Sequence, residues 1–195
     1  MAVDTTLTWP DGRQRCPWCN PQNPLYIAYH DAEWGVPCHD DHRLFEMLVL
    51  EGFQAGLSWE CVLNKRDGFR QAFDGLDASV IARYPDEKLE ALRQDSRIIR
   101  NKLKIRAART NARVFLAIQE EWGSFDAYLW HWTDGKVIYE RDCTRSLLSD
   151  QISADLKKRG MTFVGTTIIY AYLQAMGVIY SHDEGCFKSI PPSAY

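Results

Sequence analysis

The sequence has no long hydrophobic run, since no stretch approaches the 18 or more apolar residues of a membrane-spanning helix. Its first fifteen residues, MAVDTTLTWPDGRQR, lack a basic segment followed by an apolar one, so we expect no secretory signal. Glycine (12) and proline (8) are sparse, and repeats and low-complexity tracts are absent, which argues against fibrous and disordered proteins. These absences predict a globular protein with no membrane partner, and a cytoplasmic location is the default.

Charge of one sign does not dominate either. Lys and Arg number 23 and Asp and Glu 26, a net charge of -3 that argues against indiscriminate binding of polyanions. The average hides local clusters: RIIRNKLKIRAARTNAR (97–113) contains many basic residues and no acidic one, and LKKRG (156–160) adds three. A local surface could therefore still bind nucleic acid.

The apolar residues recur mostly with a helical period, which predicts an all-α chain folded as one compact body. We expect no sheet beyond short extended pieces such as KVIYE, residues 136–140. The tight connection RGMTFVG (159–165) separates the last two helices. The predicted helices cover residues 44–50, 59–73, 86–95, 102–119, 126–132, 149–158 and 166–176.

The stretch EMLVLEGFQAGLSWECVL (46–63) places a carboxylate, Glu51, among residues typical of a core. An ionised carboxyl group in an apolar setting costs on the order of several kcal/mol unless a partner compensates its charge. The alternative is that Glu51 faces solvent, if the helix ends near Gly52. Otherwise the pattern predicts that some group meets this side chain.

The sequence contains six cysteines, and an intracellular chain of this size does not need disulfides, so metal ligation is the better use for them. Cys16, Cys19 and His30 lie near the start, and His182 and Cys186 near the end. Together they offer the two His and two Cys of a tetrahedral zinc site, unless they form two unrelated surface clusters. Four protein ligands leave no open coordination position, so this zinc would be structural and would fasten the chain ends together.

Two further features could carry function. A Gly-flanked turn followed by Thr-Thr exposes backbone N–H groups at a helix N-terminus, where phosphate oxygens bind without reading bases. The alternative is an ordinary helical hairpin with a solvated basic patch. Aromatic residues that converge on a cavity can stack a planar or cationic ring, although most aromatic residues simply form core. The aromatic residues in question are Trp18, Tyr26, Tyr29, Trp34 and Trp59.

Four blocks, LYIAYHDAEWGVP, LFEMLVLEGFQAGLSW, KKRGMTFVGTTIIY and GVIYSHDEGC, resemble in order the signature blocks of 3-methyladenine DNA glycosylase I, a family of the helix-hairpin-helix glycosylase superfamily. The resemblance covers residues 15–186. It implies an all-α, two-lobed fold with a zinc site that tethers the N- and C-termini. The glycosylase domain would span 15–195 with its hairpin at 160–165, after an extension over 1–14 whose order is left open.

The implied activity is DNA repair. Such an enzyme flips N3-methyladenine out of duplex DNA into a pocket and hydrolyses its N-glycosidic bond, leaving an abasic site. Strand-cleaving relatives use a lysine after the hairpin as nucleophile; Thr167 stands at that position here, so no lyase step is expected. The implied partners are alkylated double-stranded DNA and free 3-methyladenine as product, bound by a monomer.

The resemblance also implies individual roles. Glu51 matches the base-recognising carboxylate, Tyr29 a tyrosine that hydrogen-bonds the base, and Trp59 the tryptophan that stacks on it. Since N3-methylation makes the base cationic, Glu51 would accept hydrogen bonds from the base and oppose its charge. The remaining aromatic wall matches Trp18, Tyr26 and Trp34. The DNA-backbone contacts match Lys158, Gly160, Val164, Gly165 and Thr166.

The ligands of one structural Zn²⁺ match Cys16, His30, His182 and Cys186. The spacing from Cys16 to His30 is one residue longer than usual for the family and brings in Cys19, so either cysteine could hold the metal. The likeness of Cys-Pro-Trp to the family's Cys-x-Trp favours Cys16.

Two other classes stay open. A zinc-stapled helix-hairpin-helix protein that binds DNA without glycosylase activity would tolerate loss of the pocket residues, and the joint presence of Glu51, Tyr29 and Trp59 argues against it. A zinc hydrolase with another substrate would need an open metal position.

Overall fold

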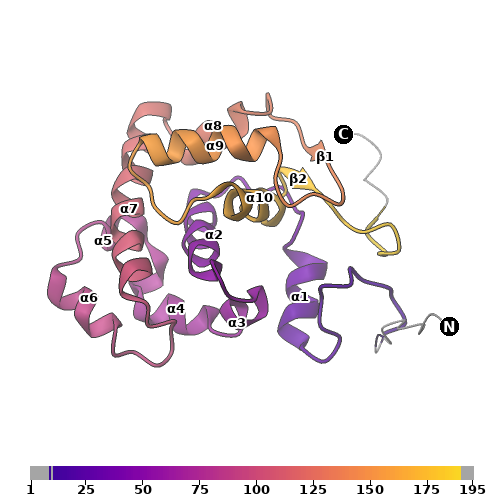
Figure 1. The fold of residues 1–195 in the computed structure, drawn as a ribbon, viewed down its shortest axis with the longest axis horizontal. Helices are drawn as coiled ribbons and strands as arrows, with labels where there is room; N and C mark the ends of the chain where they lie inside the picture. The colour runs from indigo at the N-terminus through magenta and orange to yellow at the C-terminus, as the bar shows by residue number, and fades with distance from the viewer. Residues whose placement is uncertain (1–8, 10, 190–195) are drawn as a thin grey trace.

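The computed structural model describes residue 9 and residues 11–189. Nearly all regular structure in this part of the chain is helical, which confirms the all-α prediction (Figure 1). The elements are α1 (Pro24–Ala32), α2 (Asp41–Gln54), α3 (Trp59–Leu63), α4 (Arg66–Ala72), the 3-10 helix η1 (Asp74–Leu76), α5 (Ala78–Ile81), α6 (Asp86–Leu92), α7 (Lys102–Trp122), α8 (Phe125–His131), β1 (Ile138–Tyr139), α9 (Leu147–Lys158), α10 (Thr166–Ala175) and β2 (Ile179–Tyr180). No helix among these is both long and apolar enough to cross a bilayer.

Helix α2 lies at the centre of the molecule, where α3, α7, α8 and α10 pack against it (Figure 1). Every residue from Leu44 to Phe53 is buried. A helix that is apolar nearly all round cannot lie at the surface without exposing hydrophobic side chains, so its sequence dictates this position. The Asp40 carboxylate begins the helix by accepting the backbone N–H of Arg43 at 2.8 Å.

The prediction of one helix over 59–73 is wrong. The structure has two short helices, α3 and α4, and Lys65 between them takes φ -105° and ψ 2°. Asn64 ends α3, and its side-chain oxygen accepts a hydrogen bond from Asn23 at 2.9 Å. Short polar side chains such as Asn favour helix ends over helix interiors. The break leaves α3 free to direct Trp59 toward Tyr29 of α1, at a ring distance of 5.2 Å.

The two ends of the described chain meet beside the small sheet. Strands β1 and β2 pair in parallel, with Ile138 opposite Ile179, which confirms the extended piece expected within 136–140. Past β2, the Phe187 N–H donates to the Gln14 carbonyl at 2.8 Å. Of the extension predicted over 1–14, residues 1–8 and 10 lie outside the described residues, whereas Trp9 is buried, at 4% exposure.

Lys104 of α7 supports the C-terminal end of α2. Its buried ammonium group donates to the carbonyls of Phe53 at 2.7 Å and Ala55 at 2.5 Å. The last carbonyls of a helix lack intrahelical donors and carry partial negative charge, so a cation suits them. Two turns further along α7, the Asn111 side chain exchanges two hydrogen bonds with the backbone of Thr162. Helix α7 therefore holds both the end of α2 and the connection before α10.

Lys104→Met should lower the free energy of unfolding by about 2 kcal/mol, because methionine keeps the apolar contacts but leaves buried carbonyls without donors. Urea denaturation at pH 7, followed by tryptophan fluorescence, measures this loss. The matched control is Lys102→Met, an exposed change at the same helix that should stay within about 0.5 kcal/mol of the unchanged protein. Equal stability of the two variants would contradict the role given to Lys104.

Candidate functional site

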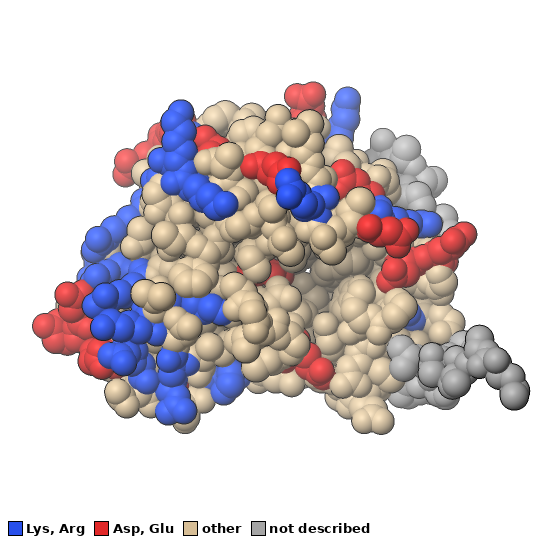
Figure 2. All heavy atoms as spheres, viewed as in Figure 1, with Lys and Arg blue, Asp and Glu red and all other residues tan. Residues whose placement is uncertain are grey.

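A cavity of about 540 Å³ opens beside the C-terminal part of α2, and α1, α3 and α10 contribute to its walls. Figure 2 shows a hollow in this region of the face, with Lys and Arg gathered on the side where α6 and α7 lie. All six residues that the resemblance assigned to base recognition line this cavity: Trp18, Tyr26, Tyr29, Trp34, Glu51 and Trp59. Their individual roles stay predictions.

Glu51 lines the cavity but is only 3% exposed, so the alternative of a solvent-facing side chain is wrong. Its Oε2 atom has no hydrogen-bond partner among the residues that the structure describes. Burial raises the pKa of Glu51 to about 8. At neutral pH the free protein therefore holds mostly the neutral acid, because the site offers the negative charge nothing in return.

Glu46, five residues earlier on the same helix, shows the contrast. It is also buried, but Arg66 reaches its Oε1 at 2.5 Å and Arg70 reaches the same oxygen at 2.8 Å. Burial alone would raise the pKa of Glu46; the hydrogen bonds and charges of Arg70 and Arg66 outweigh it, and the pKa is lowered. The two buried carboxylates of α2 thus differ in their partners, and of these two only Glu51 is available to a ligand.

The aromatic walls leave planar faces toward the cavity. The Trp18 ring lies 4.8 Å from that of Trp34 and 5.4 Å from that of Tyr26, measured between centroids. Burial raises the pKa of Tyr29 well above its ordinary value, so its hydroxyl stays neutral and can donate as well as accept. The Trp59 Nε1 donor is buried without a partner among the described residues. A planar ring with polar edges suits this arrangement.

Several residues at the cavity were not anticipated. Gln54 lies one helical turn beyond Glu51, and its Oε1 is buried without a partner in the described part of the chain. Its i+3 spacing from Glu51 was the signal that could have revealed it. The other additions come from segments distant in sequence, and no local pattern marks them. They are Asp142, Cys143, Thr144, Ala171, Gln174, Ser181 and Asp183.

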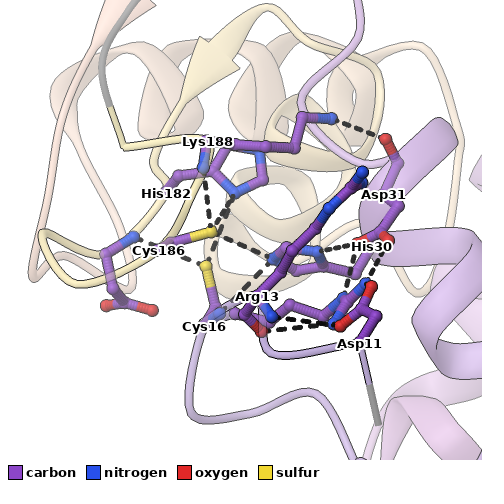
Figure 3. A network of polar contacts seen from close by, with 10 residues as sticks. Asp11, Arg13, Cys16, His30, Asp31, His182, Cys186 and Lys188 are labelled. Carbon is purple, nitrogen blue, oxygen red and sulfur yellow. Dashed lines mark hydrogen bonds and ion pairs between the residues drawn. The ribbon is translucent and has the colours of Figure 1, made fainter. Parts of the chain in front are cut away.

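A cluster of two cysteines and two histidines lies beside the cavity, where the two chain ends meet (Figure 3). The four buried side chains are Cys16, His30, His182 and Cys186, and their ligand atoms all lie within 4.8 Å of one another. Cys19 is buried too but is not a member, and burial raises the pKa of its thiol to about 12. Of the two cysteines left open by the sequence, the structure places Cys16 in the cluster.

The geometry of this cluster fits a tetrahedral metal ion. Cys16 Sγ lies 3.5 Å and Cys186 Sγ 3.6 Å from His182 Nδ1, and Cys186 Sγ lies 3.4 Å from His30 Nε2. Zinc bonds of about 2.3 Å to sulfur and about 2.0–2.1 Å to nitrogen place neighbouring ligand atoms roughly 3.3–3.8 Å apart. Both sulfurs also accept backbone N–H groups, from Asp183 and Lys188, each at 3.4 Å. Donors of this kind stabilise thiolates, which is the form that binds metal.

Comparison with known proteins shows the family to which this chain belongs. A family model described as methyladenine glycosylase matches residues 18–189. DNA-3-methyladenine glycosylase 1 of Escherichia coli (strain K12) is 44% identical over 179 residues, covering 89% of this chain and 95% of the relative. DNA-3-methyladenine glycosylase of Haemophilus influenzae is 40% identical over 178 residues, covering 88% and 96%. The chain belongs to the methyladenine glycosylase family.

Solved structures extend the likeness to the fold. A crystal structure of 3-methyladenine DNA glycosylase I superposes with a TM-score of 0.86 at 46% identity, covering 89% of this chain and 98% of the other. A variant of 3-methyladenine DNA glycosylase I in complex with 3-methyladenine gives a TM-score of 0.84 at 29% identity, covering 88% and 96%. Family membership makes this chain an enzyme, a DNA-3-methyladenine glycosylase that hydrolyses N-glycosyl bonds.

In this glycosylase, the residues predicted to contact the DNA backbone extend from the last residue of α9, Lys158, to the first residue of α10, Thr166. Lys158 and Gly160 are exposed, and Gly160 takes φ +105°, a backbone conformation that glycine adopts without strain. The Val164 side chain is buried, and its carbonyl accepts the Ser153 hydroxyl at 2.7 Å. Gly165 stands at the N-cap of α10 with no side-chain cap.

Proposed function

We propose that this glycosylase excises N3-methyladenine from alkylated double-stranded DNA and leaves an abasic site without cutting the strand. The observation that carries the proposal is Glu51, a buried carboxyl group that has no partner among the described residues, at a cavity with aromatic walls. The flipped base would occupy this cavity, with Trp59 stacked on it and the Tyr29 hydroxyl bonded to its edge. Trp18, Tyr26 and Trp34 would complete the wall.

Charge explains the selectivity of such a pocket. N3-methylation makes adenine cationic, and a cation beside Glu51 offsets the burial that otherwise keeps this group protonated. The aromatic faces attract the same positive charge. Unmodified adenine is neutral and provides neither interaction. Glu51 would therefore ionise for the damaged base and stay neutral for the normal one.

The chemistry then needs little bond-breaking force from the protein. When the bond between C1′ of the sugar and N9 of the cationic base breaks, the electron pair goes to the purine and neutral 3-methyladenine leaves. Water forms the new bond to C1′ and releases its proton to solvent. Glu51 acts by holding and orienting the cation, so we assign it the catalytic carboxylate role. Thr167 offers no amine for a Schiff base, so the strand would stay intact.

We propose that α9, the connection over 159–165 and α10 form the helix-hairpin-helix element of a two-lobed fold. The Thr166 hydroxyl donates to Asp150 at 2.6 Å, which ties the start of α10 to α9. Because no side chain caps α10, the backbone N–H groups of its first turn are available to a phosphate. Lys158 would add positive charge, and Gly160, Val164, Gly165 and Thr166 would contribute mainly through the backbone.

We propose one structural Zn²⁺ in the cluster of Cys16, His30, His182 and Cys186. The donor set and the spacing of its atoms support this ion. When bound, the ion would fasten the N-terminal segment to the residues after β2 and would leave no position for a water nucleophile. This argues against a zinc hydrolase. A monomer in the cytoplasm completes the proposal.

The test is incubation with methylated duplex DNA, followed by chromatography of the released bases and denaturing electrophoresis of the strands. We expect free 3-methyladenine, a strand that breaks only after alkali treatment, and no release from unmethylated duplex. DNA binding without base release would favour the alternative of a zinc-stapled DNA-binding protein. Direct nicking of abasic DNA would show that Thr167 does not exclude lyase chemistry.

A further inference from the structure

Arg15 is a buried cation held between two carboxylates, with its side chain only 2% exposed. Its Nε and Nη2 donate to the two oxygens of Asp31 at 2.8 and 2.6 Å. Its Nη1 and Nη2 donate to the two oxygens of Asp11 at 2.9 and 2.7 Å. The guanidinium lies over the rings of Trp9 and Phe187, 5.0 and 5.5 Å from their centroids. Two carboxylates and two aromatic rings therefore surround this group.

Asp31 also contacts the cluster of cysteines and histidines, through a hydrogen bond with His30 (Figure 3). Its Oδ1 accepts the Nδ1–H of His30 at 2.8 Å. A histidine that donates Nδ1–H presents Nε2 as its lone-pair atom, and His30 Nε2 is the atom that faces Cys186 Sγ. Lys188 adds a second tie, because its ammonium group donates to the Asp31 carbonyl at 2.9 Å.

The N-terminal part of this network lies ahead of residues 18–189, the range that the family model matches. Trp9, Asp11 and Arg15 all lie ahead of that match, and Asp11 is 45% exposed in its side chain. Trp9 and Arg15 are buried here, which indicates that these residues are packed in place rather than flexible. The contacts hold Trp9, Asp11 and Arg15 beside the cluster, on the side of His30.

We propose that Trp9, Asp11 and Arg15 form an outer clamp on the metal site, in which Arg15 is a positioning residue that slows release of the ion. Arg15 holds both oxygens of Asp31, and Asp31 holds the His30 ring with Nε2 toward the ion. For His30 to leave the ion, its ring must rotate and break its hydrogen bond to the Asp31 carboxylate. Arg15 holds that carboxylate in place, so the carboxylate does not move with the ring. Asp11 completes the clamp, because its carboxylate accepts hydrogen bonds from the second edge of the Arg15 guanidinium and offsets its charge. This inference rests on the proposed zinc site.

The experiment measures the rate at which zinc passes from the full-length protein to a chromophoric chelator at 25 °C and pH 7. Outer partners of a ligating histidine change metal affinity by about 10–100-fold, so Arg15→Gln should release zinc roughly 10–100 times faster. Arg15→Lys keeps the positive charge but cannot form paired hydrogen bonds to two carboxylates. Its rate of zinc release should therefore lie between those of the wild-type protein and Arg15→Gln. Asp11→Asn, an exposed change that leaves the fold intact, should accelerate release by a smaller factor.

Two control variants separate the clamp from general stability. Arg93→Gln removes a half-buried surface arginine that pairs with Glu90 at 2.8 Å, and it should release zinc at the unchanged rate. Lys104→Met destabilises the fold far from the cluster, and it too should leave release unchanged, because at 25 °C release does not require global unfolding. Equal acceleration in Lys104→Met and Arg15→Gln would overturn the clamp.

Metal content separates the clamp from the site itself. Unchanged release from Arg15→Gln and Asp11→Asn proteins that each carry one zinc would overturn the clamp and leave the zinc site standing. Wild-type protein that binds no zinc, as purified or after incubation with zinc, would overturn both.

Discussion

Glu51→Gln should slow excision of 3-methyladenine at least about 100-fold while making the folded protein more stable. An amide can still accept a hydrogen bond but cannot oppose the positive charge of the base, and loss of one electrostatic group at a reacting centre costs about 10²–10³ in rate. Single-turnover release from methylated DNA measures the effect. Affinity for undamaged duplex should stay unchanged, because Glu51 is not among the residues proposed to contact the DNA backbone. Normal release by the variant would contradict the role of Glu51.

The stability gain follows from the raised pKa. In the unfolded chain the carboxyl group ionises above its ordinary pKa of 4.5, whereas in the folded protein it stays protonated up to about pH 8. Between these values the unfolded state binds fewer protons, so the free energy of unfolding falls as pH rises and levels off above pH 8. At about 1.4 kcal/mol per pH unit, the loss at pH 7 is about 3 kcal/mol.

Glutamine does not ionise, so the variant escapes this loss. We expect a stabilisation of about 2 kcal/mol at pH 7, less than the full amount because the amide is buried too, and nearly none at pH 4.5. Urea denaturation of both proteins across pH 4.5–8 measures the difference. A gap that does not widen with pH would show that Glu51 is ionised in the free protein.

Glu46→Gln is the matched control on the same helix. It removes a carboxylate that Arg66 and Arg70 hold, so it should destabilise the protein, by about 3 kcal/mol, since a buried arginine loses its counter-charge. The same substitution five residues apart should therefore change stability in opposite directions. That sign difference distinguishes an unpaired carboxyl group from a paired one.

Removal of the proposed zinc should have the second large effect, and the effect should be on stability. Cys16→Ser should abolish stoichiometric zinc binding and lower the melting temperature by roughly 10–20 °C, which in a chain of this length corresponds to about 5 kcal/mol. Structural zinc sites bind with about 10–16 kcal/mol in small peptides, so this loss is within their capacity. Zinc analysis and calorimetry give the two readouts.

Cys19→Ser is the control for this change, because Cys19 is equally buried and three residues away but lies outside the cluster. It should keep one zinc per chain. In wild-type protein treated with a chelator, excision should fail only as the chain ends loosen and the melting temperature falls. Immediate loss of activity in a protein that keeps its melting temperature would point instead to a catalytic metal.

Much of the site could be predicted from sequence, because it depends on residue types within long matching blocks. All six pocket residues line one cavity, and the four predicted zinc ligands form one cluster. Helix content was predictable for a similar reason, since apolar spacing is a local property. The helix expected over 59–73 failed because both of its halves bury apolar residues, so the pattern continues across a break that Asn64 and Lys65 create.

The sequence by itself determined that the chain is helical, that α2 is buried, and which side chains could bind a cationic base or a metal. Only the tertiary structure decided that Glu46 has two arginine partners while Glu51 has none, that Cys16 rather than Cys19 joins the cluster, and that Arg15 reaches Asp31. The physical reason is that partners decide the state of a buried polar group. Those partners come from segments far apart in the chain. No local sequence pattern indicates that these segments come together in the fold.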